Sequence, residues 1–124
     1  MNSIVSNLIV PSIEACLPFY VERLGFTRTV EVPHDGVFGF AILSRGELAL
    51  MLQSRASLAA DVAGLDPDGF RAALSIEVDE LAPIREALAG WLRVIPERTT
   101  FYGAREIVVR DPAGNVVTFA SRET

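Results

Sequence analysis

The sequence predicts an α+β fold built from two βαβββ modules. First, a strand-like apolar run, a helix-like stretch and three further strand-like runs occur in this order twice. Second, the two halves align about 68 residues apart when Val10 is placed on Val78. Gly25 then falls on Gly90 after a short deletion in the second helix. Third, two apolar runs flank residues 111–114 (DPAG), a pattern typical of a β-hairpin.

The first module begins with an alternating run at residues 4–10, which predicts a strand. A helix is expected next, because Ser12 can cap its N-terminus and Gly25 can end it after Leu24. Pro18 lies inside this helix and removes one backbone hydrogen bond, so a kink is expected there. The remaining pattern predicts strands at residues 26–32, 37–43 and 47–53, with turns at residues 33–36 and 45–46.

The second module repeats this order after a linker. Residues 54–70 mix Ala, Asp, Gly and Pro, and we interpret them as a linker with room for one helical turn. Asp79 can cap a helix over residues 80–89, which Gly90 would end. Strands are expected at residues 71–78, 91–98, 104–110 and 115–120. We therefore divide the single domain, residues 1–124, into a first module (1–53), a linker (54–70) and a second module (71–124).

Composition narrows the classes of function. Sixteen acidic residues against eleven basic ones give a net charge of −5, which argues against a nucleic-acid partner. No apolar run approaches the roughly 18 residues of a membrane-spanning helix, so no membrane partner is expected. The N-terminus lacks the pattern of a secretory signal, and we expect a cytoplasmic protein. The single cysteine, Cys16, leaves no partner for an intrachain disulfide.

Two motifs carry a family resemblance. The run SIEACLPFY at residues 12–20, with LGF at residues 24–26, resembles the D-L-x-x-S-x-x-F-Y…L-G-F signature of the vicinal oxygen chelate superfamily. The run DPAGN at residues 111–115, followed by VVTF, resembles its closing D-P-D-G-N-x-x-E-F. The superfamily groups glyoxalase I, bleomycin-resistance proteins and extradiol dioxygenases. The resemblance implies half-open eight-stranded cups (the glyoxalase/bleomycin resistance/dioxygenase fold) and a homodimer that completes them.

In metal-binding relatives, four cup-facing side chains hold the ion. Carried onto this sequence, the first position falls on Val5 and the second on Met51 or, with a one-residue shift, Leu50. The third falls on Ala73 and the fourth on Thr118. The first three cannot ligate, and a neutral hydroxyl alone is a poor ligand for a divalent ion. We therefore expect no cofactor and no divalent metal, which puts glyoxalase and dioxygenase chemistry in doubt.

Without an ion, the resemblance implies a cup that binds a small molecule. Strand alternation starting from Val5 and Thr118 selects the side chains that would face it. The candidate ligand-binding residues on these strands are Asn7, Phe38, Phe40, Met51, Gln53 and Glu77. The alternative for such an apolar stripe is ordinary core.

The polar run YGARE at residues 102–106 supplies the other candidates. Metal-free, bleomycin-resistance-like members carry a similar Y-G-x-R-E, and the resemblance suggests that it lies at the rim of the cup. Tyr102 would stack on a ligand, Arg105 would hold an anionic or carbonyl group, and Glu106 completes the set. In the structural alternative, Arg105 pairs with an acid, Glu106 faces solvent and Tyr102 packs on a neighbouring ring.

Two functions follow from these residues. The first is a metal-independent, bleomycin-resistance-like protein that binds a small hydrophobic or cationic ligand. The second is a lyase or dioxygenase of the same superfamily with a relocated metal or acid–base site. A relocated metal site would use His34, which is expected in a surface turn, with Glu77 and Glu106, whereas an acid–base site would use Glu106, Tyr102 and His34.

Overall fold

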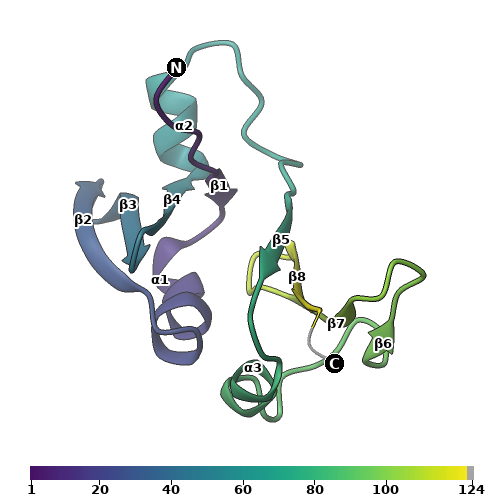
Figure 1. Cartoon of the computed structure of the whole chain (residues 1–124). Coiled ribbons are helices and arrows are strands. Elements are labelled where there is room, and N and C mark those ends of the chain that lie inside the picture. Colours follow the sequence, from purple (N-terminus) through teal and green to yellow (C-terminus); the bar gives the residue numbers. More distant parts are fainter. Residues whose placement is uncertain (123–124) are drawn as a thin grey trace. The chain divides into compact units, whose positions relative to one another are not determined.

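The computed structural model describes residues 1–122 and contains two compact units, Met1–Arg71 and Ala72–Thr124 (Figure 1). Each unit holds one four-stranded mixed sheet. In both units the first strand pairs in parallel with the last, and the remaining pairs are antiparallel. The predicted α+β architecture of two βαβββ modules is confirmed.

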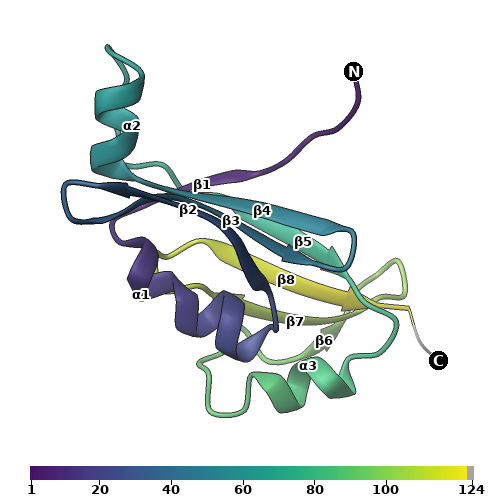
Figure 2. The same cartoon turned by 90° about the vertical axis from the view of Figure 1, so that its left-hand side faces the viewer.

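The first unit orders its sheet β1-β4-β3-β2. Figure 2 shows α1 and α2 on opposite faces of this sheet. Its elements are β1 (Asn7–Val10), α1 (Ile13–Leu17), the π-helix η1 (Pro18–Arg23), β2 (Thr27–His34), β3 (Val37–Arg45), β4 (Leu48–Ser54) and α2 (Arg55–Asp61).

The first helix begins and ends where the sequence predicts. Ser12 accepts a hydrogen bond from the Ala15 N–H at 3.2 Å and so caps the helix. From Pro18 onward the helix is a π-helix, in which the Leu24 N–H reaches back five residues to the Phe19 carbonyl at 3.1 Å. The wider turn is the observed response to the proline that was expected to cause a kink. Gly25 then takes a φ of +80° and ends the helix.

The β2–β3 connection is tighter than predicted. Only Asp35 and Gly36 form the turn, with φ values of +51° and +84°, as a two-residue hairpin loop requires. The expected four-residue turn is therefore wrong, because Pro33 and His34 belong to β2. The next turn is also shifted, since β3 extends through Arg45 and β4 begins at Leu48.

The segment predicted as a linker with one helical turn begins with a longer helix. Residues 55–61 form α2, which starts directly after β4. Ser54 caps it by accepting the Ser57 N–H at 3.1 Å, and Leu58 is its buried residue. The cap lets a helix of only seven residues form against the face of the sheet.

The second unit orders its sheet β5-β8-β7-β6. Its elements are β5 (Ala73–Glu77), α3 (Ala82–Ala87), β6 (Arg98–Thr99), β7 (Arg105–Arg110) and β8 (Val116–Ser121). The predicted helix was too long at both ends, and its N-cap residue is Leu81 rather than Asp79. The predicted strand at residues 91–98 was largely wrong, because only an isolated bridge from Arg93 to Val109 and the short β6 form there.

The closing hairpin is confirmed, and two buried side chains fix its turn. Asp111 Oδ1 accepts the N–H groups of Ala113 and Asn115 at 2.9 and 2.8 Å, and Gly114 takes a φ of +88°. Asn115 in turn accepts the Ala72 N–H at 2.8 Å, which joins the hairpin to the start of β5. This satisfies polar groups that would otherwise be costly to bury.

Each unit has a core on one face of its sheet. In the first unit, alternation brings Leu8, Leu43 and Leu52 to the face covered by α1, and all three are buried. In the second unit, Val117 and Phe119 of β8 are buried in the same way. Within residues 1–122, no helix is long and apolar enough to span a bilayer.

Candidate ligand-binding site

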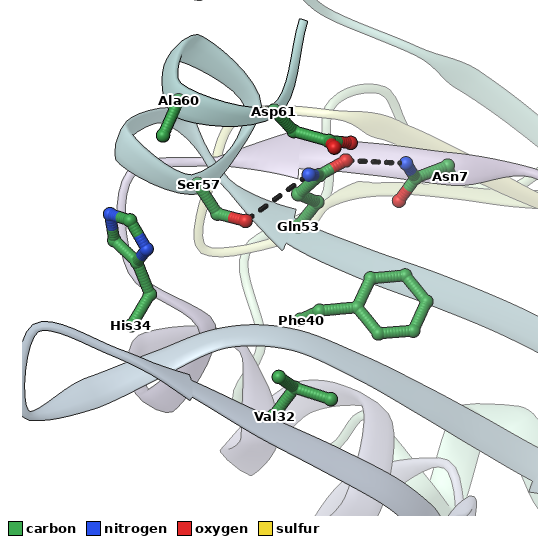
Figure 3. Close-up of a pocket in the computed structure, with 8 residues that line it drawn as sticks. All are labelled: Asn7, Val32, His34, Phe40, Gln53, Ser57, Ala60 and Asp61. Atoms are coloured by element: carbon green, nitrogen blue, oxygen red, sulfur yellow. Dashed lines mark hydrogen bonds between the residues drawn. The ribbon is translucent and has the colours of Figure 1, made fainter.

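A pocket of about 530 Å³ lies in the first unit, between the sheet and α2 (Figure 3). This volume falls within the usual range for small-molecule sites. Its lining residues are Asn7, Val32, His34, Phe40, Gln53, Ser57, Ala60 and Asp61.

Strand register brings the lining residues of the sheet together. Gln53 of β4 lies directly opposite Phe40 of β3, and Phe40 lies opposite Val32 of β2. Residues that face each other across adjacent strands project on the same side of a sheet. Gln53, Phe40 and Val32 therefore form one row across the floor of the pocket, with Asn7 beside them on β1.

A hydrogen-bond chain runs along one side of the pocket. Asn7 Nδ2 donates to Gln53 Oε1 at 2.9 Å, and Gln53 Nε2 donates to Ser57 Oγ at 3.2 Å (Figure 3). Gln53 is only 7% exposed, so these partners offset the cost of burying its amide. The chain ties β1, β4 and α2 to one another and gives the pocket a preformed polar side.

The absence of a side chain at Gly39 of β3 allows His34 of β2 and Ser57 of α2 to lie close to this strand. Pairing passes from Val32–Phe40 to Pro33–Phe38, so Gly39 has no partner and forms a β-bulge. A Cβ at Gly39 would lie 2.5 Å from His34 Cβ and 3.1 Å from Ser57 Cβ. Any larger residue would therefore displace two parts of the pocket wall.

The structure brings some of the predicted residues of this unit together and separates others. Asn7, Phe40 and Gln53 line the pocket. Met51 pairs with Asn7 and is half-buried on the same face, but it does not line the pocket. The alternation that placed Phe38 beside Phe40 is wrong, because the bulge shifts the register by one residue.

Several lining residues were missed by the sequence reasoning. Ser57, Ala60 and Asp61 come from α2, which was interpreted as linker. The signal for this helix was present in Ser54, a good N-cap residue before an Ala-containing run. His34 was expected in a surface turn, but it ends β2, lines the pocket and lies 3.4 Å from Asp35 Oδ2 through its Nε2.

The predicted residues of the second unit lie mainly around a smaller concavity. Glu77 and Glu106 both pair with Ala120 from opposite sides, so they share a sheet face. Glu106 is 6% exposed and accepts hydrogen bonds from Arg98 Nε at 3.0 Å and Tyr102 Oη at 3.1 Å. A pocket of about 170 Å³ on this face is lined by Ser75, Glu77, Tyr102, Ala104, Ala120 and Arg122.

Arg105 points to other partners. Its guanidinium donates to Glu97 Oε2 and Thr99 Oγ1, each at 3.1 Å, and Glu97 also accepts from Arg85 at 2.9 Å. Burial raises the pKa of Glu97, but the hydrogen bonds and positive charges of Arg85 and Arg105 outweigh it, so the net pKa is lowered. These contacts match the structural alternative for Arg105, in which it pairs with an acid.

The four positions that hold a metal in relatives do not fit one here. Val5, Met51 and Ala73 offer no donor suited to a divalent ion, and Thr118 offers a neutral hydroxyl. Among residues 1–122, no three His, Cys, Asp or Glu side chains form a group that could hold an ion elsewhere. We therefore derive no reaction step through a metal.

Comparison with known sequences decides the family. The sequence model of the Glyoxalase/Bleomycin resistance protein/Dioxygenase superfamily matches residues 1–119. The chain belongs to this superfamily. A search among curated proteins gave no match.

Several solved structures share the fold of this chain. Lactoylglutathione lyase from Agrobacterium tumefaciens has a TM-score of 0.76 at 17% identity, with 98% of this chain and 94% of that chain covered. TioX from Micromonospora sp. ML1 has a TM-score of 0.77 at 19% identity, with coverages of 99% and 100%. The bleomycin-binding protein from Streptomyces verticillus, solved with copper(II)-bleomycin, has a TM-score of 0.67 at 26% identity, with coverages of 99% and 98%. The structures similar to this chain therefore include a protein named as a lyase and one named as a binding protein.

Proposed function

We propose that this chain is a metal-independent small-molecule binding protein, similar in role to bleomycin-binding members of its superfamily. The observation that carries the proposal is the preformed pocket of about 530 Å³ beneath α2. Its hydrogen-bond chain holds Asn7, Gln53 and Ser57 in place before any ligand arrives. A site that is ordered in advance loses less entropy on binding.

The composition of the pocket supports binding of a small hydrophobic or cationic molecule. Phe40 and Val32 provide an apolar wall, while Asn7, Gln53 and Ser57 provide a few fixed polar groups. This mixture is typical of ligand sites, in which apolar area supplies affinity and a few polar groups set orientation. The four positions that hold a metal in relatives lack suitable ligand atoms here. This favours a binding function over a metal-dependent reaction.

The test is a screen of small molecules by thermal shift, followed by calorimetric titration of the hits. A ligand at one hundred times its Kd should stabilise the protein by about 2.7 kcal/mol. Phe40→Ala should weaken the binding of such a hit about tenfold, or about 1.4 kcal/mol, because it removes the aromatic wall. Phe70→Ala is the matched control, since Phe70 is 42% exposed and lies outside the pocket. Equal effects of both variants would place the ligand elsewhere.

Metal analysis of the same protein separates binding from the enzymatic alternative. The purified protein should contain no stoichiometric divalent ion, and chelation should leave ligand affinity unchanged. A stoichiometric ion whose removal abolishes binding or a lyase or dioxygenase activity would overturn the proposal.

A further inference from the structure

The polar groups of the first-unit pocket point in a fixed direction, and this direction defines a ligand class. We propose that the pocket takes an aromatic cation with an N–H-bearing group, such as an amidinium, at the Asn7 and Asp61 end. A hydrogen-bond acceptor on the same ligand would meet Ser57 at the other end. This inference rests on the proposed binding function and narrows it from a hydrophobic or cationic ligand to an oriented one.

The hydrogen-bond chain sets the direction. Each donor in it points from Asn7 toward Gln53 and from Gln53 toward Ser57. At one end this leaves the Asn7 Oδ1 carbonyl as an acceptor with no hydrogen bond to another residue among 1–122. At the other end, Ser57 Oγ already accepts from Gln53, so its own hydrogen is available to a ligand acceptor. The pocket therefore presents an acceptor at one end and a donor at the other.

Charge favours a positive group at the acceptor end. Figure 3 shows the Asp61 carboxylate turned toward the Asn7–Gln53 hydrogen bond, whereas Ser57 lies next to His34. Asp61 makes no ion pair with any residue in the described part of the chain, and no Lys or Arg lines the pocket. A ligand cation would thus meet two oxygen acceptors, one of them charged, without displacing a protein cation.

The apolar wall favours a flat ring between the two ends. Phe40 and Val32 are cross-strand partners, and neither is buried by the protein itself. An aromatic ring stacked on Phe40 would recover this apolar area, and a cation next to the ring adds a further attraction. A flexible aliphatic amine would gain less from this surface.

Three molecules of nearly the same shape test the charge preference: benzamidine, benzamide and benzoate. Each is titrated into ¹⁵N-labelled protein at neutral pH and low salt, with the side-chain amides of Asn7 and Gln53 as reporters. Benzamidinium should bind at least about 5-fold more tightly than benzamide, and benzoate should bind most weakly, as expected for one charge-assisted contact. Benzoate binding as tightly as benzamidinium would overturn the inference, and so would the absence of a shift with all three.

Matched variants test the position of the charge. Asp61→Asn should weaken benzamidinium binding about 5-fold and leave benzamide binding unchanged. Asp66→Asn makes the same charge change outside the pocket and should alter neither. If Asp66→Asn has the same effect as Asp61→Asn, the preference is a property of the whole charged surface, and the inference fails.

The donor end of the pocket, at Ser57, is tested with 4-carbamoylbenzamidine, which adds a carbonyl acceptor opposite the amidinium. It should bind about 3-fold more tightly than benzamidine, and Ser57→Ala should abolish only this gain. An unchanged gain in Ser57→Ala would overturn the assigned orientation. The ligand class and the binding function can fail separately. If compounds from the screen need Phe40 but prefer a negative group, the ligand class is refuted and the binding function still holds.

Discussion

Neighbouring residues of β7 have unrelated roles because they face opposite sides of the sheet. Glu106 is buried and accepts hydrogen bonds from Arg98 and Tyr102, on the face that carries Glu77. Arg105 instead pairs with Glu97, which also accepts from Arg85 of α3. Sequence order grouped Arg105 and Glu106 in one polar run, whereas the strand separates them. The Glu97 cluster is therefore a structural tie between α3 and the sheet.

The Glu97 cluster predicts a pH-dependent contribution to stability. Because the folded-state pKa of Glu97 is lowered, its contribution is complete above the unfolded-state pKa and is lost as the pH falls through the folded-state value. Glu97→Gln should therefore destabilise the protein by about 1 kcal/mol at pH 7 and by much less at pH 3. Urea unfolding at both pH values measures this. Glu86→Gln, an exposed change on α3 next to Arg85, should show little effect at either pH. An equal loss of stability for Glu97→Gln at both pH values would contradict the prediction.

For helices and strands, the sequence alone predicted the structure correctly where residues close in sequence determine the backbone conformation. The β7–β8 hairpin was predicted because Pro112 and Gly114 suit one turn geometry, and Gly114 takes the expected positive φ. The strand predicted at residues 91–98 was largely wrong, since Trp91 Nε1 and the Arg93 guanidinium donate to backbone carbonyls and hold the chain there without a continuous strand ladder. Such side-chain contacts depend on tertiary position and leave no periodic signal.

The stability of α2 should depend on its N-cap, because a short helix has few hydrogen bonds of its own. Ser54→Ala should cost about 1 kcal/mol of stability and loosen the turn that carries Ser57, so the affinity of a pocket ligand should fall. Ser12→Ala is the matched control, since it removes the cap of α1 and should cost similar stability without changing affinity. Chemical denaturation and calorimetric titration measure the two effects. Equal losses of affinity in both variants would show that α2 does not shape the site.

At the scale of the whole molecule, the site was only partly predictable. Alternation was enough to place Asn7, Phe40 and Gln53 on one face, because β1, β3 and β4 are regular there. It failed at Phe38, where the bulge at Gly39 shifts the register, and it could not supply Asp61, which depends on α2. The bulge is set by the pairing of β2 with β3, where His34 lies against Gly39, so a single sequence reveals it poorly, whereas α2 had a local signal in its cap Ser54.

Exposed apolar side chains on the described residues support the proposal of a homodimer. Phe101 is fully exposed and forms an edge-to-face pair with Tyr102, with ring centroids 5.1 Å apart. On edge strand β2, Val30 is 41% exposed and lies outside the pocket lining. Unpaired edge strands and exposed aromatic rings are features that a second subunit commonly covers.

Light scattering coupled to size-exclusion chromatography tests the dimer. The mass in solution should be twice the 13.5 kDa of one chain. Phe101→Lys should shift the population toward the monomer at micromolar concentration, because it places a charge in a contact that we expect to be apolar. Leu65→Lys changes a residue that is 44% exposed and lies outside both the Phe101 pair and β2, so it should leave the mass unchanged. A monomeric mass for the unmodified protein would contradict the dimer. The lining residues of the first-unit pocket all come from one chain, so we expect the pocket to bind its ligand in either state.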